Sequence, residues 1–138
     1  MRFWDSSALV PLCLAQRISD RARKLYDEDP ELVVWWGSPV ECASALARLR
    51  REAVIDEGGE ADARAILGRL AETWYEVQPG THLRDQAVRL LRIHPLRAAD
   101  ALQLAAALDW SGPAPSGGLV SFDDRLNEAA RREGFATP

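Results

Sequence analysis

Four carboxylates in this sequence stand directly after short apolar runs or near the start of apolar helical patterns, where acidic side chains can do chemistry. They are Asp5 after "RFW", Glu41 in "SPVECASALARL", Asp100 in "RAADALQLAAAL" and Asp123 after "GLVSF". Two such charges 4 Å apart repel by about 1 kcal/mol in water and about 4 kcal/mol at an effective dielectric of 20. A carboxylate cluster therefore favours a compensating cation, and Mg²⁺ or Mn²⁺ prefers oxygen ligands. We interpret these acids as candidate ligands of such an ion.

A bound Mg²⁺ or Mn²⁺ lowers the pKa of a water molecule and neutralises charge that develops on a phosphate. The sequence offers little for other mechanisms, since it has no Gly-x-Ser-x-Gly elbow and no phosphate-binding Gly-rich loop with a lysine. Distance excludes a catalytic histidine pair, because His82 and His94 lie at opposite ends of one predicted helix, roughly 18 Å apart. Both histidines are predicted at the surface.

Each of the four acids has an alternative role as a helix cap. The stretches "SPVE" and "DALQ" have the spacing of a capping box, in which two side chains satisfy free N–H groups of the first turn. The candidate capping residues are Asp5, Ser38 with Glu41, Asp100 with Gln103, and Ser121 or Asp123. Capping does not require the carboxylates to lie together, whereas metal binding does. For Asp5 we predict metal binding in place of capping.

Asp100 is the clearest single indication. The segment Ala98–Leu108 is apolar on all sides except at Asp100 and Gln103, which is typical of a buried helix. A carboxylate in such a helix needs a counter-charge.

The elements that must position these acids alternate between strand and helix. Strands are predicted at Arg2–Asp5, Glu31–Trp36, Tyr75–Val77 and Leu119–Ser121, with a weakly supported fifth near Phe135. Helices are predicted from about Ser7, then at Ile18–Asp29, Pro39–Ala53, Glu60–Trp74, Thr81–His94, Arg97–Trp110 and Asp124–Glu133. This alternation predicts an α/β protein, a three-layer α/β/α fold with a short, mostly parallel central sheet. In such folds strand ends and helix starts share one edge, where ligands bind.

Length and composition limit the number of domains, the attraction for nucleic acid and the cellular location. A chain of 138 residues is expected to form one domain. Its net charge of −4 gives no general attraction for nucleic acid, although all its basic residues except Lys24 are arginine. Cys13 and Cys42 are predicted as core residues of a reduced protein. No apolar stretch has the roughly 20 residues that span a bilayer, so we expect a cytoplasmic location and no membrane partner.

Four motifs resemble those of one enzyme family. "FWDSSALVPL" resembles the opening strand and turn of PIN-domain ribonucleases, and "SPVECASALARL" their second motif. "RAADALQLAAAL" is the closest match, and "LVSFDDRLNEAA" is similar to their late strand, which ends in Thr or Ser, any residue, then Asp. All four occur in family order over essentially the whole chain. Length and order are most similar to VapC-type toxins of bacterial toxin–antitoxin pairs.

The resemblance implies a site and a reaction. It makes Asp5, Glu41, Asp100 and Asp123 the catalytic, metal-binding acids, and Ser7 and Ser121 the hydroxyl groups that support them. The chain departs from the family in having Ser rather than the commoner Thr at Ser121, and in the adjacent carboxylates of Asp123 and Asp124, of which Asp123 has the motif spacing. The implied reaction is hydrolysis of an RNA phosphodiester by a water that Mg²⁺ or Mn²⁺ activates.

The implied partners are RNA, a small antitoxin that lies across the active-site edge, and a second copy of the chain in a homodimer. The apolar stretch Ala8–Ala15 is a candidate surface for the antitoxin or the dimer. Arg48, Arg97 and Arg125 are candidate contacts to RNA phosphates, unless they pair with neighbouring acids such as Glu52.

Two other functions are compatible with acids at a sheet edge. A phosphoacceptor receiver domain also holds Mg²⁺ there, but receivers usually need a lysine late in the sheet, and the only lysine is Lys24. A catalytically inactive PIN fold that only binds a partner is the second alternative.

Overall fold

A computed structural model describes residues 1–115 and 117–138. Its sheet has the strand order β3-β2-β1-β4, and every pairing between these strands is parallel. The strands are β1 (Arg2–Trp4), β2 (Leu32–Trp35), β3 (Tyr75–Val77) and β4 (Leu119–Val120). The predicted α/β fold with a short parallel sheet is confirmed.

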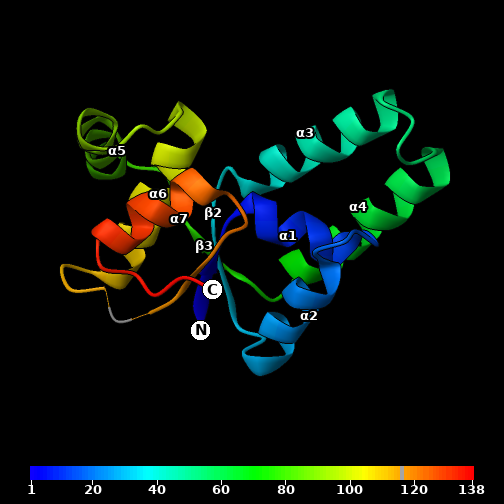
Figure 1. The fold of residues 1–138 in the computed structure, drawn as a ribbon, viewed down its shortest axis with the longest axis horizontal. Coiled ribbons are helices and arrows are strands. Elements are labelled where there is room, and N and C mark those ends of the chain that lie inside the picture. Colours follow the sequence, from blue (N-terminus) through cyan, green and yellow to red (C-terminus); the bar gives the residue numbers. More distant parts are fainter. Residues whose placement is uncertain (116) are drawn as a thin grey trace.

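Seven helices in the described chain cover the two faces of the sheet (Figure 1). They are α1 (Ser6–Cys13), α2 (Ser19–Glu28), α3 (Ser38–Arg51), α4 (Glu57–Ala71), α5 (Thr81–Ile93), α6 (Ala98–Ser111) and α7 (Asp124–Arg132). Helices α5, α6 and α7 contribute to one core cluster, and helices α1 to α4 to the other. The result is the predicted three-layer α/β/α arrangement.

Side-chain alternation along the strands divides the core between these two layers. In β1, Phe3 belongs to the α5–α7 cluster and its neighbour Trp4 to the α1–α4 cluster. In β2, Val33 and Val34 divide in the same way. Successive strand residues point to opposite faces, and both faces here are covered. This is why β2 has a continuous apolar sequence without a polar face.

Three smaller predictions need correction. Part of the apolar stretch Ala8–Ala15 is unavailable to a partner, because α1 packs against α2, α3 and α4, and Ala8 and Leu9 have no exposed area, although Val10 and Pro11 line a cleft. His94 is buried, with its Nε2 atom 2.6 Å from Glu133 Oε1, and is not a surface residue. The fifth strand is reduced to one isolated parallel bridge between Gly118 and Ala136.

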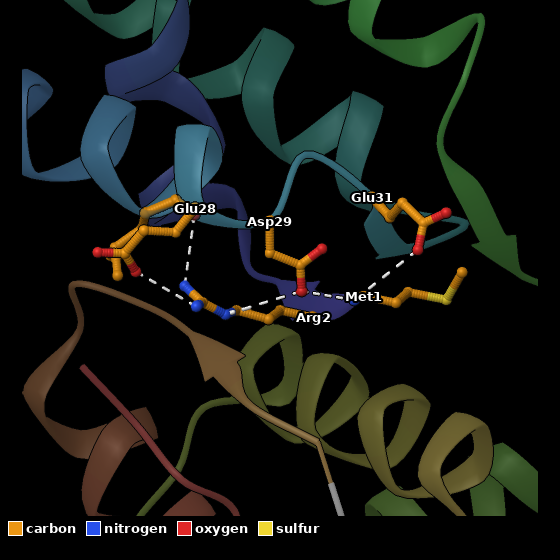
Figure 2. A network of polar contacts seen from close by, with 6 residues as sticks. Met1, Arg2, Glu28, Asp29 and Glu31 are labelled. Atoms are coloured by element: carbon orange, nitrogen blue, oxygen red, sulfur yellow. Dashed lines mark hydrogen bonds and ion pairs between the residues drawn. The ribbon is translucent and has the colours of Figure 1, made fainter.

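The amino-terminal end of β1, which is the end opposite Asp5, is held by charged groups. Figure 2 shows the Met1 ammonium between Asp29 and Glu31, and the Arg2 guanidinium between Glu28 and Asp29. The hydrogen bond from the ammonium holds the pKa of Asp29 below its usual value. These contacts join β1 to the connection between α2 and β2.

None of the helices in residues 1–115 and 117–138 combines the length and the hydrophobicity that a membrane span requires.

Candidate active site

The four predicted acids line one cleft of about 700 Å³. Asp5 directly follows β1, and Asp123 directly follows the short turn after β4. Glu41 and Asp100 lie in the first turns of α3 and α6. Because the sheet is parallel, these strand ends and helix starts meet at one edge, as the sequence predicted.

Asp5 is both a helix cap and a member of this group. Its Oδ2 atom accepts hydrogen bonds from Ser7 N at 3.1 Å, from Ser7 Oγ, and from Ser121 Oγ at 3.0 Å. The first of these bonds caps α1. The prediction that Asp5 would not act as a cap was therefore wrong, because Asp5 caps α1 and also lines the cleft. Burial raises the pKa of Asp5, and the bonds from Ser7 and Ser121 lower it in part.

The two serines connect α1 to the segment that carries Asp123. Ser7 Oγ accepts a hydrogen bond from Phe122 N at 2.9 Å, and Ser121 Oγ accepts one from Asp123 N at 3.0 Å. The hydroxyl oxygens of Ser7 and Ser121 lie 3.2 Å apart. The position of Asp123 relative to Asp5 is thus set by hydrogen bonds through both hydroxyl groups, which is the supporting geometry expected of Ser7 and Ser121.

Glu41 is held by polar groups from two other helices. Its Oε2 atom accepts hydrogen bonds from Ser6 Oγ at 2.9 Å and from Gln103 Nε2 at 3.0 Å. Burial raises the pKa of Glu41, the bonds from Gln103 and Ser6 lower it, and the charges of Asp5 and Asp100 raise it further. Glu41 therefore lies close enough to Asp5 and Asp100 for their negative charges to raise its pKa.

The capping box proposed for "SPVE" is absent. The residue before α3 is Gly37, which makes no side-chain cap, and Glu41 is directed toward Ser6 and Gln103 instead. The pairing of Asp100 with Gln103 is also wrong. Asp100 Oδ2 accepts instead from Arg97 N at 3.3 Å.

Asp100, on α6, and Asp123, directly before α7, are the other two acids that line the cleft. Asp123 Oδ1 accepts from Leu126 N at 2.9 Å and caps α7. Burial raises the pKa of Asp100, and the charge of Asp123 raises it further, while Arg125 and Arg97 lower it. The four acids thus form a chain of electrostatic neighbours.

The donor set fits a hard divalent cation. Among the described residues, Glu41 Oε1, Asp100 Oδ1 and Asp123 Oδ2 accept no hydrogen bond, and Asp5 Oδ1 accepts only from Ser6 Oγ at 3.3 Å. No three His, Cys, Asp or Glu side chains within residues 1–115 and 117–138 converge tightly enough to form a complete metal cage. Mg²⁺ does not require one, because it usually keeps several water ligands and binds through one or two carboxylates.

Comparison with known proteins identifies the family. A family model described as "PIN domain" matches residues 2–132. The chain belongs to the PIN-domain family. Two curated PIN-domain relatives from Mycobacterium tuberculosis, ribonuclease VapC45 and ribonuclease VapC49, are each 33% identical over 96% of this chain and 90% of their own length. Among PIN-domain proteins, the chain therefore belongs with the VapC group, and the match favours this fold over the receiver-like alternative.

Several solved structures share the fold at low sequence identity. VapC20 from Mycobacterium tuberculosis, described as a toxin that cleaves the sarcin-ricin loop, has a TM-score of 0.72 at 19% identity, covering 99% of this chain and 97% of its own. PAE2754 from Pyrobaculum aerophilum has a TM-score of 0.68 at 21% identity, with coverage of 99% and 87%. FitAcB from Neisseria gonorrhoeae has a TM-score of 0.66 at 14% identity, with coverage of 99% and 96%.

The basic residues predicted to contact RNA occupy different places in this PIN domain. Arg48 lines the acidic cleft. Arg97 and Arg125 do not line it, but both lie near enough to Asp100 to lower its pKa. Asp124 lines a separate pocket of about 210 Å³ that also contains Arg125, so Asp123 is the carboxylate that faces the cleft.

Sequence reasoning assigned Ser6 no role and gave Gln103 the wrong one. Gln103 is fully buried in α6 and donates from Nε2 to Ser38 Oγ at 3.1 Å as well as to Glu41. A polar residue in an otherwise apolar helix was the available signal. Ser6 offered none, because its partner Glu41 is distant in sequence.

Proposed function

We propose that this PIN-domain protein is an endoribonuclease toxin that depends on Mg²⁺ or Mn²⁺ and hydrolyses RNA phosphodiester bonds. The observation that carries the proposal is the convergence of four carboxylates from four separate elements on one cleft. The identity of 33% with two VapC ribonucleases over nearly the whole chain supports the same activity. Capping alone does not account for Glu41, which caps no helix and is held beside the other acids by Ser6 and Gln103.

The residues of the site would have two kinds of role, metal binding and positioning of the metal ligands. Among Asp5, Glu41, Asp100 and Asp123, one or two would bind the ion directly through carboxylate oxygens, and the others would contact it through its water ligands. When bound, Mg²⁺ or Mn²⁺ supplies a water of lowered pKa and neutralises charge on the phosphate. Two positioning pairs keep the carboxylates in place, Ser7 with Ser121 at Asp5, and Ser6 with Gln103 at Glu41. Such outer partners fix the geometry of metal ligands and tune their basicity.

RNA would be held by few cations, because the chain is acidic overall. Arg48 is the arginine best placed for a phosphate next to the cleaved bond, since it lines the same cleft as the acids. Arg97 and Arg125, near Asp100, would contact RNA only beyond the cleft. The positive charge near the site is therefore local, as selective rather than general RNA binding requires.

The partners would be a second copy of the chain and a small antitoxin. Helix α5 exposes Val88, Leu91 and Ile93, with exposed fractions of 42% to 55%. These exposed apolar side chains support dimer formation better than Ala8 and Leu9 of α1, which have no exposed area. The antitoxin would act by covering the acidic cleft.

The test is incubation of the protein with total RNA, with and without Mn²⁺, followed by mapping of the cut ends. We expect cleavage at a limited set of positions, only with Mn²⁺ or Mg²⁺. Asp100→Asn should abolish it, whereas Asp85→Asn, a surface acid on α5, should not. An intact protein that leaves all RNA uncut with either metal would favour the catalytically inactive, partner-binding alternative.

A further inference from the structure

The cleft that holds the acids also has an apolar side. Its apolar lining residues are Val10, Pro11, Ile18, Val40, Ala45, Leu49 and Phe122. Two of them are sequence neighbours of the acids, Phe122 beside Asp123 and Val40 beside Glu41. Val40 is 70% exposed. Apolar surface thus flanks the carboxylates on both α3 and the connection between β4 and α7.

Phe122 is the only aromatic residue among those that line the cleft, and its position is fixed by the site itself. Its backbone N–H donates to Ser7 Oγ at 2.9 Å, and Ser7 also donates to Asp5. Phe122 is half-buried, so part of its surface remains accessible. The backbone hydrogen bond connects Phe122 to Asp5 through the Ser7 hydroxyl.

The ring of Phe122 also contacts a guanidinium group. Arg21 on α2 places its Cζ atom 5.7 Å from the ring centroid, within the range of a cation–π contact. Arg21 is not among the residues that line the cleft, whereas Phe122 is. Phe122 therefore borders both the cleft that contains the acids and the guanidinium of Arg21.

We propose that Phe122 forms a nucleobase subsite, in which it stacks on the base of a nucleotide next to the phosphate at the acids. This assignment rests on the proposed RNA-cleaving function. Aromatic side chains stack on unpaired bases because every base has a π-face, and each such contact contributes about 1–3 kcal/mol. The acids and Arg48 contact only the backbone of RNA, which carries no base information. Phe122 is then the cleft residue that selects RNA in which the base next to this phosphate is unstacked.

The test compares two RNA probes that differ only in their bases. One is a fluorescent oligouridine of about 12 nucleotides, a length within the site sizes of single-strand binders, and the other is an abasic ribose-phosphate strand of equal length. Binding is measured by anisotropy in Mg²⁺, with Asp100→Asn as the background so that the probes stay intact. In that background, Phe122→Ala should weaken binding of oligouridine by about 5- to 140-fold, the equivalent of about 1–3 kcal/mol. Its affinity for the abasic strand should not change.

Two further variants separate stacking from packing. Phe122→Trp should retain the preference for the strand with bases, whereas Phe122→Leu, which keeps apolar contacts with the core, should lose most of it. Equal effects of Phe122→Ala on both strands, or equal affinity of the Phe122-containing protein for both strands, would overturn the subsite. The unsubstituted protein with total RNA and Mn²⁺ tests the proposed function separately, so cleavage there with no base dependence at Phe122 would reject only the subsite.

Discussion

Replacing Gln103 by Met should loosen Glu41 while leaving the core filled. Met has nearly the volume and length of Gln, and it donates no hydrogen bond. The substitution removes one bond to a carboxylate at 3.0 Å, worth about 1.5–3 kcal/mol, and one to the buried Ser38 hydroxyl at 3.1 Å, worth about 0.5–1.5 kcal/mol. It also removes Gln103 Oε1, which is buried without a partner, and this offsets about 1–3 kcal/mol. At the middle of each of these ranges, the net destabilisation is about 1–2 kcal/mol.

For a chain of 138 residues this corresponds to a melting temperature lower by about 3–10 °C. RNA cleavage should fall by about 10- to 100-fold, the usual effect of losing an outer partner of a metal ligand. The assays are differential scanning calorimetry and cleavage of the mapped RNA. Gln86→Met on α5 is the matched control, since the side chain of Gln86 hydrogen-bonds among the described residues only to Arg89, and it should change stability by less than about 0.5 kcal/mol. If Gln103→Met were as stable and as active as the parent, Gln103 would not position Glu41.

Three other predictions follow from the site and its surroundings. Mg²⁺ or Mn²⁺ should raise the melting temperature by binding the native state, and Asp100→Asn should weaken that response; an unchanged response would contradict its place in the metal site. Asp123→Asn should lose RNA cleavage and Asp124→Asn retain it, because only Asp123 lines the cleft; the reverse result would exchange their roles. Burial raises the pKa of Glu133, but its bonds to His94 and Arg89 hold the pKa below the usual 4.5, so its stabilising effect is present above about pH 4.5 and lost as pH falls. Glu133→Gln should therefore lower stability to urea more at about pH 7 than at about pH 3, and an equal effect at both would refute this.

The strands and the edge they share were predictable from short-range patterns. The run around Val33 and Val34 is apolar without alternation, which indicated a strand covered on both faces, and both faces are covered. Asp5 and Asp123 follow such runs, so parallel pairing alone placed them at the same edge. These features depend on neighbouring residues, and a single sequence contains that information.

The errors concern contacts between residues far apart in the chain. Glu41 and Gln103 are separated by 62 positions, and the sequence alone suggested nearer partners for both. The burial of Ala8 and Leu9 in α1 was not predictable, because the enclosure of α1 by α2, α3 and α4 depends on the assembled fold. His94 is buried for the same reason, since Glu133 approaches it only when α7 packs near the end of α5. Local patterns do not determine which side chain satisfies another across the fold.

The central claim is that the carboxylates at the sheet edge act on RNA through a bound metal ion, and Asp5→Asn tests it most directly. Asn caps a helix about as well as Asp, and it preserves shape, so the cap of α1 and the fold should persist. Circular dichroism and the melting temperature check this. At normal Mg²⁺ we predict that cleavage of the mapped RNA falls by at least about 100-fold, the scale for removing a group that stabilises charge. Full cleavage by a folded Asp5→Asn protein would contradict the assignment of Asp5 as a metal ligand and the nuclease mechanism built on it.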